Sequence, residues 1–262
     1  MSVGLAILEA LSDAPDGLTV SELAQQIGVH KGVVSKTLRR LVAQNYVVAS
    51  PTTTRFQLAI SILALGLRWA DRMGFPGICL PVLQDLADET GELVQLGVID
   101  GPRLLFVAKA EGRDQRIRMV SMLGQVAPLH ATAAGKVFLA SLPEVEALAL
   151  VKRQGLRAFT RRTITSLTTL RRELTRVRTL GYAVVEEELV EGAGAVAAGI
   201  RLPRQDNRVV GTVSLSGPTF RLPPARKHQL APKVVAAARR LAEIWPLQPR
   251  LPLPVTMVTP AL

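Results

Sequence analysis

Three hydroxyl side chains alternate along a β-type run near the carboxyl end of the chain. Thr212, Ser214 and Ser216 are each separated by one residue, so on an extended strand they would share one face. Such a row of hydroxyls can meet the oxygen atoms of a small acid, although a strand face exposed to water would also carry hydroxyls. The glycine spacing of a nucleophile elbow is missing here, and no histidine and acid stand nearby in sequence to complete a triad. The pattern therefore favours binding over catalysis.

Two glycine-containing segments resemble nucleotide-binding loops without meeting their requirements. The tripeptide Ala-Gly-Lys at 134–136 ends like a phosphate-binding loop, but His130 stands where the first glycine is needed and Val137 replaces the magnesium-binding hydroxyl residue. Residues 192–197 match a dinucleotide-binding fingerprint, yet a strand-like run follows where a helix must begin. The sequence therefore argues against both kinds of nucleotide chemistry.

The composition argues against a metal centre, a disulfide and a membrane span. The chain has 262 residues, of which 48% are apolar and 20% charged, as in folded globular proteins. It has one cysteine, Cys79, and its three histidines are far apart in sequence, so we expect no internal disulfide, no metal site and no cofactor. The longest nearly uncharged stretch, 56–67, is shorter than the ~20 residues that a transmembrane helix needs. An amino terminus with Glu9 and Asp13 and no basic n-region is not a secretory signal, so we expect a cytoplasmic protein.

Basic side chains gather on one side of a predicted helix at residues 31–44. Its apolar residues recur at helical spacing and would form a buried stripe made of Val34, Leu38, Leu41 and Val42. A step of about 100° per residue places Lys36, Arg39 and Arg40 on the opposite side, which carries no acid and where Gly32 allows close approach. A helix in the major groove of DNA needs small and cationic groups on its outer side, because phosphates flank it on both walls. The pattern therefore predicts DNA binding, with an ordinary solvated basic face as the alternative.

The elements around this helix are those expected of a winged helix-turn-helix. Apolar residues at helical spacing predict a first helix at 2–12, and a capping box at 19–22 begins a second. Two β-prone runs joined by a turn predict a two-stranded wing between 46 and 58. We expect Thr53 and Arg55 of this wing to contact DNA together with the basic helix.

The positive charge of the chain is concentrated outside this amino-terminal part. The formal net charge is +11, but residues 1–55 carry five basic and four acidic side chains. Residues 152–178 contain nine basic side chains and one acid. This segment is either a solvated arginine-rich face or an auxiliary contact for a polyanion, and the sequence leaves both interpretations open.

The helix-turn-helix sequence LTVSELAQQIGVHKGVVSKTLRRLVAQNYV is followed, after a further helix pattern, by the run PLHATAAGKVFLA at 128–140. Shorter motifs lie at 159–165, 178–184, 187–188 and 213–218. With these motifs the chain resembles an IclR-type transcriptional regulator over residues 5–67 and 75–245. The run at 128–140 is the most specific part of the resemblance.

The resemblance implies an α+β two-domain fold. Its parts would be a winged helix-turn-helix DNA-binding domain at 1–58, a linker helix at 59–74, a GAF-like effector-binding domain at 75–246 and a Pro-rich tail at 247–262. The residue patterns agree with this division. Helical patterns lie at 131–141, 143–151, 166–180 and 223–245, three β-type runs lie within 93–121, and further β-type runs lie at 182–187, 195–202 and 208–216.

The resemblance also places an effector pocket in the carboxy-terminal domain. The matching positions that offer donors are the amides of Ala133 and Ala134, at or near a helix start, and the hydroxyls of Ser214 and Ser216. Val185 and Ala195 stand where the family has an acid and a cysteine, so this part of the pocket would be apolar. Met119 and Met122 could line the same pocket or fill the core. Lys136 would more often bind a neighbouring acid than a ligand.

The recognition helix departs from the family pattern near its start. Gly32 and Val33 occupy positions where the family often has Ser-Thr, which removes two hydroxyl donors. We expect Lys31, Ser35 and Lys36 to carry more of the phosphate contacts in their place.

The sequence thus predicts a ligand-responsive, sequence-specific DNA-binding transcriptional regulator that is not an enzyme. Its expected partners are double-stranded operator DNA and a small organic acid, with no membrane. Because two half-sites multiply affinity, we expect a homodimer or a dimer of dimers. The helix at 59–72 would pair across a twofold axis or pack on its own wing. Two alternatives remain: an effector sensor without specific DNA binding, and a small-molecule hydrolase on a GAF-like fold.

Overall fold

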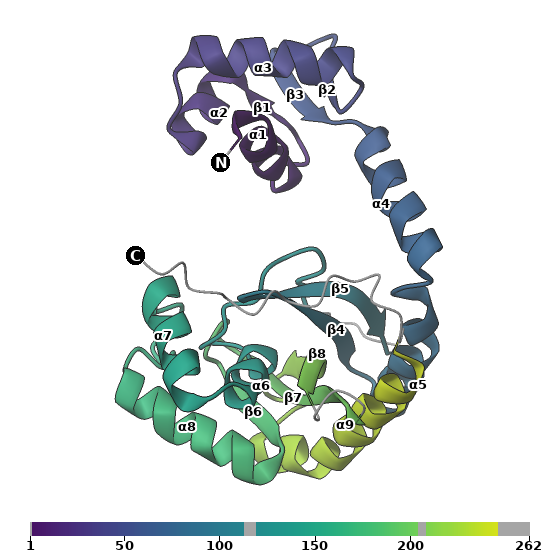
Figure 1. Ribbon diagram of the computed structural model, residues 1–262, viewed down its shortest axis with the longest axis vertical. Helices are drawn as coiled ribbons and strands as arrows, with labels where there is room; N and C mark the ends of the chain where they lie inside the picture. The colour runs from purple at the N-terminus through teal and green to yellow at the C-terminus, as the bar shows by residue number, and fades with distance from the viewer. Residues whose placement is uncertain (1, 113–118, 204–207, 246–262) are drawn as a thin grey trace. The chain divides into compact units, whose positions relative to one another are not determined.

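The computed structural model describes residues 2–112, 119–203 and 208–245, so the Pro-rich tail expected at 247–262 lies outside the described residues. The chain divides into two compact units, Met1–Met73 and Gly74–Leu262 (Figure 1). Within the described ranges, no helix is long and apolar enough to cross a membrane.

The first unit contains four helices and a small sheet in its described part. The elements are α1 (Val3–Ser12), β1 (Leu18–Thr19), α2 (Val20–Ile27), α3 (Lys31–Ala43), β2 (Val47–Ala49), β3 (Arg55–Leu58) and α4 (Ile60–Met73). The first three helices surround one apolar core that includes Ile7, Leu23, Val34 and Leu38. This burial confirms the helical spacing of the predicted apolar stripe in α3.

Local hydrogen bonds explain where α2 begins and ends. The Thr19 hydroxyl accepts from the Glu22 amide at 3.2 Å, and the Glu22 carboxylate accepts from the Thr19 amide at 2.7 Å. This reciprocal pair confirms the predicted capping box. Gly28 ends the helix in the left-handed conformation, with φ of 67°.

The two predicted strands of the wing are present as β2 and β3, which pair antiparallel, and a third strand that the sequence did not predict joins their sheet. In the order β1-β3-β2, the two-residue strand β1 pairs antiparallel with β3 through Leu18 and Phe56. A two-residue strand is too short to show alternation in the sequence, and only the approach of β3 gives it a partner.

The second unit is built on a five-stranded antiparallel sheet in the order β5-β4-β8-β7-β6. Its strands are β4 (Leu93–Asp100), β5 (Arg103–Glu111), β6 (Tyr182–Glu186), β7 (Ala193–Leu202) and β8 (Arg208–Pro218). Its helices are η1 (Gly77–Cys79), α5 (Leu80–Thr90), α6 (Ala133–Ser141), α7 (Glu144–Gln154), α8 (Leu167–Leu180) and α9 (Pro224–Ile244). Of the three β-type runs expected within 93–121, two are strands, residues 119–121 are not in a strand, and 113–118 lie outside the described residues.

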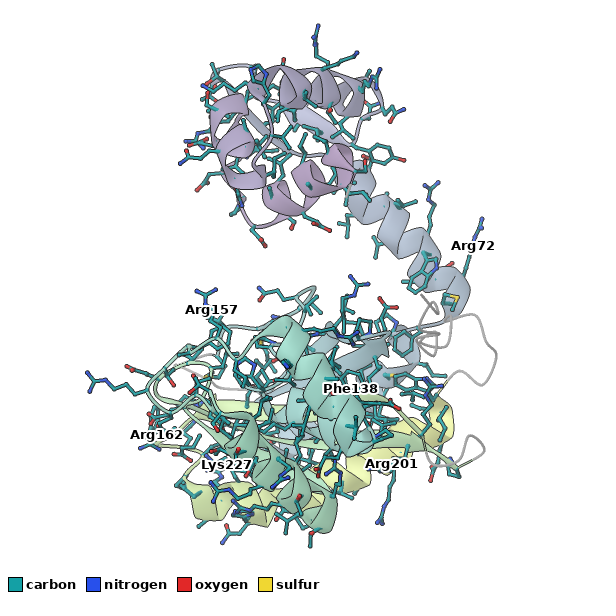
Figure 2. All side chains as sticks on the ribbon, turned by 60° about the vertical axis from the view of Figure 1, so that its left-hand side comes forward. Arg72, Phe138, Arg157, Arg162, Arg201 and Lys227 are labelled. Atoms are coloured by element: carbon teal, nitrogen blue, oxygen red, sulfur yellow. The ribbon has the colours of Figure 1, made fainter. Side chains whose placement is uncertain are left out.

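Helices cover both faces of this sheet (Figure 1). Helix α6 packs against β6, β7 and β8, and α7 and α8 pack around α6. Helices α5 and α9 cover the other face. Phe138 of α6 is 3% exposed and belongs to the apolar core that α6 shares with the sheet, α7 and α8 (Figure 2). The sheet face beneath α6 also carries the alternating hydroxyls of β8.

Candidate functional site

The outward side of α3 carries the predicted DNA contacts. Its exposed residues include Lys31, Gly32, Lys36, Arg39 and Arg40, while Ser35 is half-buried. We call the four cations the basic surface of α3. Within the described residues, no carboxylate forms an ion pair with these cations, so they can pair with phosphates.

A histidine that the sequence interpretation did not use begins the recognition helix. His30 Nδ1 accepts a hydrogen bond from the Gly32 amide at 3.2 Å. His30 thus occupies the N-cap of α3, where serine, threonine, aspartate and asparagine are the usual residues. His30 and Gly32 are two positions apart, so the sequence could have indicated this cap. Histidine is an uncommon N-cap residue, and for that reason the pattern was not recognised.

The two wing residues expected to contact DNA have different surroundings. Arg55 donates to the Gly17 carbonyl at 2.6 Å and pairs with Glu22 at 3.2 Å, so its guanidinium is engaged inside the unit. The partners of Arg55 inside the unit, Gly17 and Glu22, are distant in sequence, and its DNA contact stays a prediction. Thr53 is exposed in the turn of the wing, where its hydroxyl accepts from the Arg55 amide at 3.3 Å. Thr53 remains available to solvent, and its DNA contact stays a prediction.

The arginine-rich segment at 152–178 is only partly free. Arg162, at the periphery of the second unit (Figure 2), lies 3.1 Å from Glu187. Arg178 donates to the Ala140 carbonyl at 3.0 Å, which ties α8 to the end of α6. At least two of the nine cations therefore stabilise the fold. For the exposed ones, a solvated arginine-rich face and an auxiliary contact for a polyanion both remain open.

The second unit contains a small cavity between the sheet and the start of α6. Its volume is about 110 Å³. Pockets for drug-sized ligands measure roughly 300–1,000 Å³, so this cavity suits a compact molecule. Its lining comprises Gln95, Phe106, Met119, Val120, Met122, Ala131, Thr132, Ala133, Ala134, Val185, Glu188, Leu189, Val190, Ala193, Gly194, Ala195, Ser214 and Ser216.

All seven residues proposed from sequence for effector binding lie in this lining. They are Met119, Ala133, Ala134, Val185, Ala195, Ser214 and Ser216. The sheet register brings several of them together, because Ser216 pairs with Ala195 and Ala195 pairs with Val185. Their role in binding stays a prediction. The sequence interpretation missed Gln95, Phe106 and Glu188 as wall residues.

One member of the hydroxyl row does not reach the cavity. Thr212 shares the β8 face with the two serines, yet it is fully buried opposite Gly97 on β4 and does not line the pocket. Ser214 is only 4% exposed, so the alternative of a solvated strand face is wrong for this residue. Ser214 is buried because helix α6 covers this face of the sheet, and the alternation of residues along one strand cannot indicate such a cover.

The start of α6 lies at the wall of the cavity. Thr132 is the N-cap, and its hydroxyl accepts from the Gly135 amide at 3.0 Å. Ala133 and Ala134 line the cavity, and their amides belong to the first turn of α6, where helix amides have no intrahelical acceptor and attract anions. A Cβ on Gly135 would lie 2.4 Å from the Leu129 backbone, so only glycine permits this close packing at the helix start.

A buried ion cluster lies beside the same cavity. Lys136 is fully buried in α6 and donates to Glu188 Oε1 at 2.5 Å, while Glu173 Oε1 of α8 lies 3.7 Å away. This arrangement confirms that Lys136 binds a neighbouring acid. Burial raises the pKa of the Glu188 carboxyl, against the opposing influences of Lys136 and the Ile164 amide. A lysine inside an otherwise apolar helix was the sequence signal that such an acid must exist.

The histidines of the second unit are engaged away from the serines. His130 Nε2 lies 2.9 Å from the Arg157 carbonyl, and His228 Nδ1 lies 2.9 Å from the Tyr182 hydroxyl. In residues 2–112, 119–203 and 208–245, His, Cys, Asp and Glu side chains form no group of three that could hold a metal ion.

Comparisons with known proteins cover both units. The model "Bacterial transcriptional regulator IclR C-terminal" matches residues 69–243, and a MarR family model matches residues 5–55. The chain is 34% identical over 239 residues to the glycerol operon regulatory protein of Streptomyces coelicolor, covering 90% of this chain and 91% of the relative.

Solved structures resemble the chain as well. An IclR transcriptional regulator from Alicyclobacillus acidocaldarius is 27% identical, with a TM-score of 0.81 over 92% of this chain and 96% of the other. A double mutant of the PobR inducer-binding domain from Acinetobacter, in complex with 3-hydroxybenzoic acid, is 26% identical, with a TM-score of 0.59 over 64% of this chain and 97% of the other.

Proposed function

Because this chain belongs to the IclR family of bacterial transcriptional regulators, we propose that a compact organic acid controls it through the cavity of the second unit. The protein is a ligand-responsive DNA-binding regulator with an amino-terminal helix-turn-helix and a carboxy-terminal effector-binding domain. The finer proposal is that the effector has one carboxylate and an apolar body. The operator contacts would come from the basic surface of α3.

The observation that carries the proposal is that four residues able to donate hydrogen bonds line one small, mostly apolar cavity. Ala133 and Ala134, whose amides are in the first turn of α6, line it together with Ser214 and Ser216. Amides in the first turn of a helix favour an anion, and hydroxyls can complete the hydrogen bonds of a carboxylate. Val185 makes another part of the wall apolar. A ligand with one acidic end and a hydrophobic body matches this division.

A relative's ligand supports the same chemical class. The PobR inducer-binding domain holds 3-hydroxybenzoic acid, a compact aromatic acid. The fold of that domain resembles the second unit, which makes aromatic acids a reasonable first set of probes. The relatives of this chain are regulators, and we propose that the cavity binds its ligand without chemical turnover.

The regulator is proposed to act as a homodimer or a dimer of dimers. Helix α4 has no buried residue, and its apolar side includes Ile60, Leu63 and Leu67, which are 78%, 55% and 59% exposed. Packing of this helix on its own wing was the competing expectation, and the exposure favours pairing with a second copy. A tenfold change in DNA affinity corresponds to about 1.4 kcal/mol of differential ligand binding between two arrangements of the winged units.

The test is a titration of the full chain with compact acids. Benzoate, hydroxybenzoates and short-chain carboxylates are measured by calorimetry on the wild type, on the double variant Ser214→Ala and Ser216→Ala, and on Ser166→Ala. Ser166 is exposed and makes no side-chain capping bond, so its substitution serves as a matched control. We expect the double variant alone to lose acid binding at least tenfold while its ligand-free DNA binding is unchanged. Undiminished acid affinity in the double variant would place the site elsewhere.

A further inference from the structure

The turn after β6 holds Glu188 at the wall of the cavity. Glu187 has a left-handed backbone with φ of 54°, which a residue other than glycine adopts where surrounding contacts hold it. The Glu187 amide donates to the Ala193 carbonyl at 2.7 Å, and its carboxylate accepts from the Gly192 amide at 2.9 Å. The Thr163 hydroxyl donates to the Glu188 carbonyl at 2.6 Å. The backbone on both sides of the Glu188 side chain is therefore fixed.

The protein uses only one oxygen of the Glu188 carboxylate. Oε1 accepts from Lys136 at 2.5 Å, whereas Oε2 is buried and has no hydrogen-bond partner among the described residues. Lys136 also faces Glu173 at 3.7 Å, so one positive charge serves two carboxylates. Glu188 is only 8% exposed, and a buried acceptor without a partner is unfavourable. Glu188 is a wall residue of the cavity, which leaves a molecule bound there as the candidate source of the missing donor.

We propose that Glu188 Oε2 accepts a hydrogen bond from a hydroxyl or amino group of the effector, which is then a hydroxy- or amino-substituted acid. The inference rests on the proposed function, because it takes the cavity as the effector site. The cavity has two polar regions of opposite character: the donors at Ala133, Ala134 and the β8 serines, and the acceptor at Glu188. An acid with a separate donor group satisfies both regions. A second carboxylate at Glu188 would be repelled by its charge.

The test compares matched acids on the full wild-type chain by calorimetry. The probes are benzoate, 3-hydroxybenzoate, 3-aminobenzoate and isophthalate, with butyrate and 3-hydroxybutyrate as an aliphatic pair. We expect at least one substituted acid to bind ten or more times tighter than its unsubstituted parent, and isophthalate to bind more weakly than benzoate. This comparison needs no variant, so it remains decisive if a substitution prevents folding.

Three variants test whether the preference for substituted acids depends on the Glu188 carboxylate. Glu188→Gln removes the charged acceptor and should reduce the preference to threefold or less, measured as the ratio of the two affinities within this variant. Glu173→Gln alters the same ion cluster from α8, outside the cavity lining, and should keep the tenfold preference. Glu188→Asp, which keeps the charge on a shorter arm, should give an intermediate value.

The outcomes separate this inference from the proposed function. If parents bind as tightly as their substituted partners, or isophthalate binds best, the acceptor role of Glu188 is overturned while the acid effector stands. If Glu173→Gln loses the preference as fully as Glu188→Gln, the charge of the cluster and not the Glu188 oxygen is responsible, and the inference is wrong. If no acid of the panel binds the wild type, the proposed function fails together with the inference.

Discussion

Arg55 Nη2 lies 3.2 Å from Glu22 Oε1, so the guanidinium and the carboxylate form an ion pair. Arg55 opens β3 and Glu22 lies in the first turn of α2, so this ion pair joins the wing to the helix that precedes α3. The same carboxylate closes the capping box with Thr19. One acid therefore stabilises both the start of α2 and the position of the wing.

The first prediction concerns the pH dependence of this unit. Hydrogen bonds from the Thr19 amide and hydroxyl, together with Arg55, hold the pKa of the Glu22 carboxyl below its usual value of 4.5. A lowered folded-state pKa contributes stability that is present above the unfolded pKa and is lost as pH falls through the folded one. We expect Glu22→Gln to destabilise the winged unit at neutral pH and to differ progressively less from the wild type well below pH 4.5. Hydrogen exchange of the α2 amides measures this, and a difference that stays constant with pH would contradict it.

The second prediction tests the basic surface of α3. Arg39→Ala and Arg40→Ala should weaken operator binding, and wild-type affinity should fall steeply with salt because phosphate contacts release counterions. If the arginine contacts a guanine, its removal should cost roughly 1–3 kcal/mol of binding free energy and relax the preference for one base. If it contacts a phosphate, its removal should reduce the slope of log affinity against log salt concentration by about one. Binding is measured by fluorescence anisotropy on a fragment recovered from the genome. Arg239→Ala, an exposed cation on α9, should leave affinity unchanged. Unchanged binding in both α3 variants, with intact circular dichroism, would remove α3 from the interface.

The third prediction concerns the start of α6. In Gly135→Ala the new methyl group would meet the Leu129 backbone at 2.4 Å, which a flexible side chain cannot relieve. We expect a loss of about 1–3 kcal/mol in the free energy of unfolding of the second unit, together with weaker acid binding, because the helix start must shift. Denaturation followed through the buried Trp245 reports on this unit. Gly66→Ala in α4 is the control: nothing lies within 4 Å of its added carbon, so the change should be neutral or stabilising. Equal stability of the Gly135→Ala chain would refute the close-packing argument.

The fourth prediction concerns assembly. Leu63→Glu with Leu67→Glu places charges on the exposed apolar side of α4 and should convert an oligomer to a monomer, because charges at a buried contact are strongly unfavourable. Light scattering at micromolar concentration measures the mass. Arg68→Glu, exposed on the same helix, controls for added negative charge. A wild-type monomer, with or without DNA, would contradict the proposed assembly.

Local interactions made much of the winged unit predictable from the sequence. The capping box of Thr19 and Glu22 spans three residues, and the buried side of α3 follows the 3.6-residue repeat through Val34 and Leu38. Likewise, the two-residue alternation of β8 placed Ser214 and Ser216 on one face before any partner strand was known. Signals of this kind depend only on neighbours within a turn or a strand.

Contacts between distant segments could not be read in this way. Arg55 is directed to Gly17 and Glu22 because β3 lies beside β1, a pairing that no local pattern specifies. Thr212 shares a strand face with Ser214 and Ser216 but is buried opposite Gly97 and does not line the cavity. Alternation along the strand alone would have placed all three hydroxyls in the pocket.

The cavity shows the same division between local and tertiary information. The sequence by itself placed a helical pattern at 131–141 and indicated that Lys136 binds a neighbouring acid. Only the tertiary structure decided that the acid is Glu188, 52 positions away, and that its second oxygen remains without a partner among the described residues. The physical reason is that hydrogen bonds and periodicity act over a few residues, whereas burial and charge pairing depend on how the whole unit packs.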